Sequence, residues 1–189
     1  MCIRDRPNTM RIFHEWKAKR REKSLLAKIR NRKITRSPVN FDQARSVGLL
    51  FEATDPQHRN IVRQYADELK NKGIEVTLFA FLRENEPNPN FAFKHFTKKD
   101  LNWFQQPKEE AINGFINQPF DFLINLYLKP EPALEFVSGL SRAHLRVGPY
   151  SEKLHSYDLM IDTARQPNLD FFVKHVSYFL NRLKNSSRA

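Results

Sequence analysis

Short apolar runs alternate with amphipathic stretches over residues 46–189. Ser46–Glu52 is a nearly continuous apolar run, which is typical of a strand covered on both faces. Thr54-Asp55-Pro56 then supplies a helix N-cap and a proline for the first helical turn. The apolar positions that follow have the spacing of one buried helical face, and Gly73 ends that helix. These patterns predict a strand, a helix and a second strand over residues 74–82.

The same alternation continues to the end of the chain. We expect further strands over 91–96, 120–128, 143–147 and 157–162, and helices after Pro107, over 130–140 and over 169–183. Such alternation favours a mostly parallel sheet with right-handed crossovers and helices on both faces. The predicted fold class is therefore α/β: one Rossmann-like three-layer domain over 46–189, with five to six strands, preceded by a basic helical arm over 10–45.

The arm consists mostly of good helix formers, and it has no Pro or Gly between Met10 and Arg36. Its apolar residues form two groups on nearly opposite sides of a helix. Ile12, Phe13 and Trp16 lie on one side, and a second group lies on the other. The second group is Leu25, Leu26 and Ile29. We therefore expect either two shorter helices or one helix that contacts different surfaces at its two ends.

Most of the positive charge is in this arm. The chain has a net charge of +11, and residues 10–45 hold twelve Lys and Arg against three acidic residues, a net +9. Such asymmetry is typical of an element that binds polyanions. We predict that the arm contacts RNA, for example in the ribosome, and that the protein is a non-enzymatic binding protein. The predicted phosphate contacts are Lys17, Lys19, Arg20, Arg21, Lys28, Arg30, Arg32 and Lys33, with Trp16 stacking on a base.

This interpretation requires that acidic residues of the body do not already neutralise the cations of the arm. Two alternatives stay open for the arm. It could be solvated or dock on a protein, or it could lie on an anionic membrane surface, although a membrane-surface helix needs a single apolar face.

Residues 1–9 differ from the rest of the chain. They lack helical and strand periodicity, and the opening MCIRDR resembles translated sequencing-adapter read-through, so we interpret them as a non-native leader. They include Cys2, the only cysteine, which excludes an internal disulfide. The sequence also lacks a secretory signal and a long apolar run, so we expect a cytoplasmic protein.

Polar residues at the predicted strand ends form a candidate ligand crevice. In an open parallel sheet, ligands bind beyond the carboxyl ends of the strands. The candidates are Glu52, Thr54, Asp55, Asn125, Tyr127 and Asp162. They suggest an alternative function, an enzyme or binding domain for a phosphorylated or sugar ligand. The first turn lacks the glycine patterns that cradle a dinucleotide or phosphates, so we predict no cofactor. The six histidines lack the spacing of metal ligands, so we predict no metal site. We also assign no catalytic residue.

The segment Lys98–Phe104 places Trp103 and Phe104 beside two lysines. These aromatic side chains could stack on a base or a partner, or they could fill the core under a long connection.

Two resemblances follow from these segments. SVGLLFEAT, KDLNWF, FDFLINL, LSRAHLRVG and YDLMID resemble an uncharacterised family of basic α/β proteins from the Bacteroidota, over residues 10–183. This resemblance implies a fold and a bacterial group, and no activity. Residues 120–150 also resemble the strand–helix–strand unit in the N-terminal Rossmann-like domain of heptosyltransferase-type glycosyltransferases. Those enzymes need a second domain, so this likeness implies the fold and not the activity.

Overall fold

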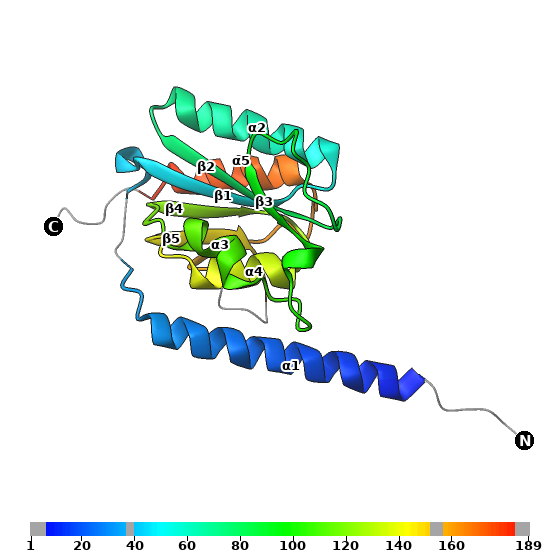
Figure 1. The fold of residues 1–189 in the computed structure, drawn as a ribbon. Helices are drawn as coiled ribbons and strands as arrows, with labels where there is room; N and C mark the ends of the chain where they lie inside the picture. Colours follow the sequence, from blue (N-terminus) through cyan, green and yellow to red (C-terminus); the bar gives the residue numbers. More distant parts are fainter. Residues whose placement is uncertain (1–6, 37–39, 152–156, 184–189) are drawn as a thin grey trace, which may run out of the picture.

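The computed structural model describes residues 7–36, 40–151 and 157–183, and it contains a six-stranded sheet with helices on both faces (Figure 1). The helices are α1 (Pro7–Arg32), α2 (Pro56–Asn71), α3 (Glu109–Ile116), α4 (Pro132–Leu140) and α5 (Leu169–Leu180). The strands are β1 (Ser46–Glu52), β2 (Glu75–Leu82), β3 (Lys94–Thr97), β4 (Phe122–Leu126), β5 (Leu145–Pro149) and β6 (Leu159–Ile161). Two short 3-10 turns, Phe41–Gln43 and Lys98–Asp100, complete the described elements.

All five strand pairings are parallel, in the order β3-β2-β1-β4-β5-β6. This is the order of the Rossmann fold, in which the chain reverses its direction of winding between β1 and β4. Helices α2 and α5 cover one face of the sheet, and α3 and α4 cover the other (Figure 1). The predicted α/β fold class and its three layers are confirmed.

The central strands are buried on both faces, as their continuous apolar runs predict. Along β1, Leu49 and Phe51 belong to the core beneath α2 and α5, whereas Leu50 belongs to the core beneath α3 and α4. The alternation arises because successive side chains of a strand point to opposite faces. Two separate cores therefore hold the sheet between the helices.

The sequence located most element ends within a few residues. Asp55 caps α2 by accepting a hydrogen bond from the backbone N–H of Gln57, with Pro56 in the first turn. Gly73 has a φ of +79°, which glycine adopts without strain after a helix. One end is wrong: α5 stops at Leu180, and Leu183 is 38% exposed instead of buried in the helix.

Helix α1 is one continuous helix, so the two-helix alternative is wrong. It ends at Arg32, because Lys33 takes a left-handed conformation with φ 45° that closes the last turn. It lies along the outer side of α4, and its amino-terminal turns extend past the body (Figure 1). Within the described ranges, no helix is long and apolar enough to cross a membrane.

Candidate functional site

One face of α1 is fixed to the body by hydrogen bonds to the segment before α3. Gln106 is buried and holds the helix with both ends of its amide. Its Nε2 donates to the backbone carbonyl of Arg21 over 3.2 Å, and its Oε1 accepts from the hydroxyl of Ser24 over 3.2 Å. The guanidinium of Arg21 donates to Oε1 of Gln105 over 2.6 Å. These bonds set the position of the helix along the body.

Two further cations of α1 continue this contact along α3. Nζ of Lys28 lies 2.6 Å from Oε1 of Glu109, and Nη2 of Arg32 donates to Oδ1 of Asn117 over 2.7 Å. Together with Arg21 and Ser24, these residues recur every three or four positions and form one stripe of the helix. We call this side, with Leu25 and Ile29, the inner face of α1.

Apolar contacts beside the stripe complete the inner face. Leu25 is only 5% exposed and packs against Gly139 of α4, where an added Cβ would lie 2.9 Å from Cδ1 of Leu25 and 3.2 Å from Cδ1 of Ile29. Gly139 thus permits the close approach of the two helices. After the helix, Arg36 donates to the backbone carbonyls of Ser141 and Ala143.

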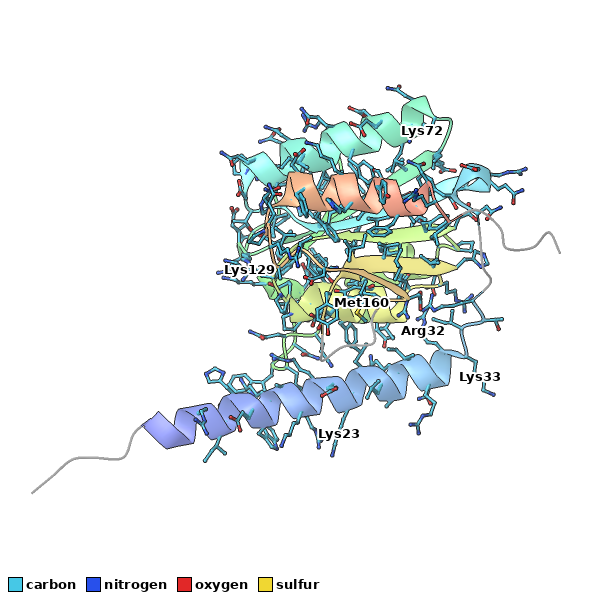
Figure 2. The ribbon with its side chains drawn as sticks, turned by 180° about the vertical axis from the view of Figure 1, so that it is seen from behind. Lys23, Arg32, Lys33, Lys72, Lys129 and Met160 are labelled. Atoms are coloured by element: carbon cyan, nitrogen blue, oxygen red, sulfur yellow. The ribbon has the colours of Figure 1, made fainter. Side chains whose placement is uncertain are left out.

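The opposite side, the outer face of α1, carries cations that meet no partner among the described residues. At 3.6 residues per turn, Lys19, Lys23 and Arg30 lie within roughly 40° of one another, about 140° from Leu25. Arg20 and Lys33 flank them, and all five side chains are exposed. Figure 2 shows Lys23 and Lys33 pointing away from the body, whereas Arg32 lies between the helix and the body.

The eight predicted phosphate-binding cations therefore have three different surroundings. The structure places Arg21, Lys28 and Arg32 on the inner face, where Lys28 alone contacts a carboxylate. Lys17 lies over the ring of Trp103, 3.8 Å from its centroid. The remaining four face solvent, and Lys23 joins them. The four are Lys19, Arg20, Arg30 and Lys33.

An exposed aromatic patch adjoins the outer cations at the amino-terminal half of α1. It consists of Phe13, Trp16, Trp103 and Phe104, with Lys17 among the rings. The ring centroids of Phe13 and Trp16 are 6.1 Å apart, and those of Trp16 and Phe104 are 6.2 Å apart. Trp103 is 69% exposed and Trp16 is 50% exposed, so neither fills the core. This decides between the two readings of Trp103 in favour of an exposed side chain.

The predicted strand-end crevice is partly filled by an arginine from the loop after β2. Nη2 of Arg83 lies 2.5 Å from Oε2 of Glu131, and Nε lies 3.9 Å from Oε1 of Glu52. The same carboxylate of Glu52 accepts a hydrogen bond from the N–H of Thr54 over 2.9 Å. Glu52 and Thr54 are thus brought together at the point where the winding reverses.

The other four crevice candidates do not join them. Asp55 caps α2, and Asp162 accepts from the N–H of Ala164 at the far edge of the sheet, three strand spacings or about 14 Å from β1. Asn125 is buried inside β4, where it donates to the carbonyl of Val147. The buried hydroxyl of Tyr127 pairs with that of Tyr157 over 2.5 Å. Among the described residues, no group of three or more His, Cys, Asp and Glu could hold a metal ion.

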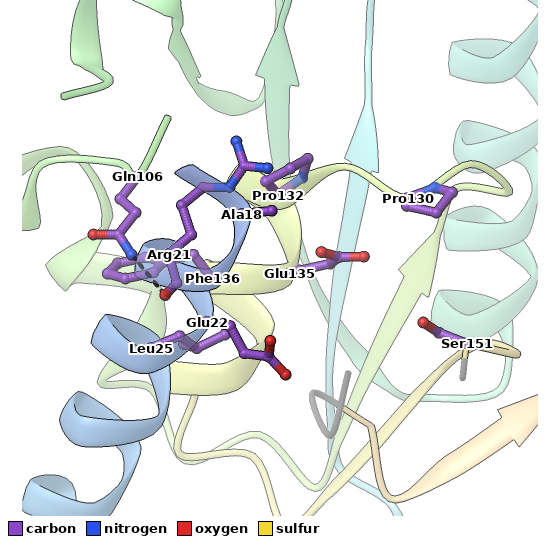
Figure 3. A pocket seen from close by; sticks show the side chains of 10 residues that line it. All are labelled: Ala18, Arg21, Glu22, Leu25, Gln106, Pro130, Pro132, Glu135, Phe136 and Ser151. Atoms are coloured by element: carbon purple, nitrogen blue, oxygen red, sulfur yellow. Dashed lines mark hydrogen bonds between the residues drawn. The ribbon is translucent and has the colours of Figure 1, made fainter. Parts of the chain in front are cut away.

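A pocket of about 240 Å³ lies beside this crevice, between α1 and the start of α4 (Figure 3). Its walls are mostly apolar, and the charged residues in the described part of the lining are Arg21, Glu22 and Glu135. Glu135 is only 5% exposed, and in Figure 3 its carboxylate extends from α4 towards the side on which Pro130 and Ser151 lie. Sequence reasoning missed this residue, although a glutamate among the inward positions of an apolar helix was a usable signal.

Burial makes Glu135 of α4 and Glu131, the residue before this helix, unusually weak acids. It raises the pKa of Glu135 to about 7, with the nearby charge of Glu131 adding to the effect and Arg21 opposing it. Burial also raises the pKa of Glu131, and the guanidinium of Arg83 partly offsets that rise. At neutral pH, Glu135 can therefore hold or release a proton, as ionisable groups at binding sites often do.

Comparison with known proteins places the chain in a family. A family model described as a family of unknown function (DUF6913) matches residues 17–183. Because the match covers most of the chain, the chain belongs to this family. The matched residues include α1 from Lys17 onward and all six strands of the sheet. A search of curated proteins found no match. The predicted uncharacterised family is thus confirmed, while the bacterial group and the glycosyltransferase likeness stay predictions.

Proposed function

We propose that this member of the family is a binding protein that contacts structured RNA through the outer face of α1, in the cytoplasm and for example on the ribosome. One observation carries the proposal. Lys19, Arg20, Lys23, Arg30 and Lys33 are exposed without an acidic partner among the described residues. From Lys19 to Arg30 they extend over about 16 Å of helix axis. A row of cations of this kind binds phosphates by releasing counterions.

The aromatic patch supports RNA over other polyanions. Trp16 and Trp103 expose ring faces beside Lys17, and bases that are unpaired in RNA loops stack on such rings. An anionic membrane is less well supported. Leu25 and Ile29 already pack on α4, while Phe13 and Trp16 lie on the other side of the helix, so α1 offers no single apolar face for insertion into lipid.

The strand-end alternative has weaker support as well. The cation nearest to Glu52 is Arg83, and it is already paired with Glu131 and Glu52. A phosphate at this place would compete with two carboxylates for one guanidinium, and it would meet their negative charge.

A salt titration tests the proposal. The full chain and its variants would be titrated with a hairpin RNA that has a single-stranded loop, between about 50 and 200 mM salt. The triple variant Lys19→Gln, Lys23→Gln, Arg30→Gln should lower the slope of log K against log salt by about 2 to 3. A matched triple variant on α2 and the residue that follows it, Arg63→Gln, Lys70→Gln, Lys72→Gln, makes the same change in net charge on the other side of the sheet. It should leave the slope within about 1 unit of the wild type.

The aromatic patch has its own readout. Trp16→Ala and Trp103→Ala should weaken binding to the looped RNA, by about 1 to 3 kcal/mol for each stacked base, and leave the salt slope unchanged. Salt-insensitive binding, equal losses in the two triple variants, or tighter binding to anionic vesicles than to RNA would overturn the proposal.

A further inference from the structure

We propose that the pocket between α1 and α4 binds a small molecule that carries a protonated amine on an aromatic or aliphatic body. The amine would contact the carboxylate of Glu135, and the body would lie against Leu25 of α1 and Phe136 of α4, which both line the pocket. This site is separate from the outer face of α1, and it lies beside the strand-end crevice predicted from the sequence.

The size and lining of the pocket set the size and character of the ligand. Its volume of about 240 Å³ is below the range of about 300–1,000 Å³ of drug-sized pockets, so it suits a molecule the size of an amino-acid-derived amine. The pocket walls include Pro130, Pro132, Leu25 and Phe136, which offer apolar surface on both sides. An apolar ligand body would gain its binding free energy from burying this surface.

The buried carboxylate is what such a ligand would satisfy. The carboxylate of Glu135 lines the pocket, where burial and the nearby charge of Glu131 disfavour its ionised form. Three polar neighbours are engaged with other groups: Arg21 donates to Gln105, and the hydroxyls of Tyr127 and Tyr157 pair with each other. An ammonium group in the pocket would stabilise the ionised carboxylate through a charge-assisted hydrogen bond.

The charges around the pocket favour a cation over an anion. Three carboxylates, those of Glu22, Glu131 and Glu135, lie in or next to the pocket, and Arg21 is the one cation among the lining residues that the structure describes. Glu131 is itself paired with Arg83. An anionic ligand would be drawn to Arg21 but would lie against the carboxylate of Glu135, and repulsion between like charges in a low-dielectric site is strong.

The affinity for an amine should depend on pH in a defined direction. Glu135 faces Glu131, whose charge raises its pKa, and Arg21, whose charge lowers it, and its pKa is about 7. Burial raises the pKa of Tyr127 and Tyr157 above that of an ordinary tyrosine, so both hydroxyls stay neutral between pH 6 and pH 8. An ammonium binds the ionised carboxylate, so its affinity should rise from pH 6 to pH 8, by up to about tenfold per pH unit below the pKa of Glu135.

Calorimetric titration of the full chain with three probes of one shape tests the inference. The probes are tryptamine, indole and indole-3-acetate, which are cationic, neutral and anionic at pH 8. Tryptamine should bind at least about tenfold more tightly than either of the others, a difference of roughly 1.4 kcal/mol. The neutral probe shows how much of the affinity comes from apolar contact alone.

Variants then assign the binding to Glu135. Glu135→Gln should lower the affinity for tryptamine at pH 8 by about tenfold or more, and it should remove the pH dependence. Glu22→Gln is the matched control at an exposed wall of the pocket, and it should change the affinity by less than about threefold. Ala18→Trp, on the exposed side of the pocket, should block all three probes without removing a buried contact.

The results that would contradict this inference are specific. Preference for indole-3-acetate, affinity that falls as pH rises, equal binding to wild type and Glu135→Gln, or no binding of tryptamine would overturn it. RNA binding by Glu135→Gln distinguishes this inference from the proposed function, because the variant leaves the outer face of α1 unchanged.

Discussion

The inner and outer faces of α1 use the same residue types for different purposes. Leu25 and Leu26 are neighbours in the sequence, yet Leu25 is 5% exposed against Gly139 and Leu26 is 44% exposed. Lys28 contacts Glu109, whereas Lys23 faces solvent. The difference shows that position around the helix, and not residue type, decides what each cation of this segment does.

The comparison also changes the meaning of the net charge. The cations of the inner face donate to Gln105, Glu109 and Asn117, so they attach the helix to the body. Among the described cations of α1, those of the outer face and Lys17 beside them are left to attract a polyanion. A count of charges along the sequence therefore overstates the charge that a partner would meet.

The largest expected effect comes from the two leucines. Leu25→Ala should destabilise the protein by about 2 to 4 kcal/mol and lower the melting temperature by roughly 5 to 15 °C, because it leaves a cavity between α1 and α4. Leu26→Ala should stay within about 0.5 kcal/mol of the wild type. Thermal unfolding measures both, and hydrogen exchange of the α1 amides shows whether the helix detaches first. Equal effects of the two substitutions would contradict the assignment of the faces.

An intermediate effect is expected at the buried wall of the pocket. Folding raises the pKa of Glu135 from 4.5 to about 7, so the folded protein binds this proton more tightly than the unfolded chain does. The stability that this contributes is fully present below pH 4.5, and it is lost as the pH rises through 7. Glu135→Gln should therefore be more stable than the wild type at pH 8, by about 1 to 3 kcal/mol, with the difference shrinking towards pH 4.5.

Denaturant unfolding at several pH values measures this difference. Glu22→Gln, at an exposed position of α1, serves as the control and should show a much smaller change with pH. A Glu135→Gln variant that is less stable than the wild type at pH 8 would mean that the carboxylate makes a favourable contact when it is ionised.

The smallest effect is expected for the ion pair of the inner face. Lys28→Gln removes the contact with Glu109, and because both side chains are partly exposed, it should cost less than about 1 kcal/mol. The pKa of Glu109, which the hydrogen bond and charge of Lys28 lower, should rise towards its ordinary value in this variant. Lys23→Gln on the outer face should leave the pKa of Glu109 unchanged. An NMR titration of Glu109 in both variants measures this difference. Equal titration curves would mean that Lys28 does not contact Glu109 in solution.

Much of the fold could be predicted because strands and helices carry their burial pattern locally. The run Ser46–Glu52 predicted β1 to the residue, and Thr54-Asp55-Pro56 predicted the start of α2. Other strands were predicted a few residues too long, as for residues 120–128, where β4 covers Phe122–Leu126. Two of the extra residues, Phe120 and Tyr127, are buried outside the ladder, so apolarity alone does not mark where strand pairing stops.

The sites were harder to predict because their partners are distant in the sequence. Asn125 was expected at an accessible strand end, but it lies inside β4, where it is buried and donates a hydrogen bond to the carbonyl of Val147. Tyr127 was a crevice candidate, and it is instead paired with Tyr157. Glu135 was overlooked, because only the packing of α1 over α4 shows that its carboxylate lines a pocket.

The sequence by itself determined the order of strands and helices, the coverage of the sheet on both faces, and the concentration of cations ahead of it. Each of these follows from residue spacing or composition within a short segment. Only the tertiary structure decided which cations are left for a partner and which glutamate lines a pocket. The physical reason is that both depend on contacts between distant segments, such as Lys28 with Glu109, and these form when α1 packs on α4.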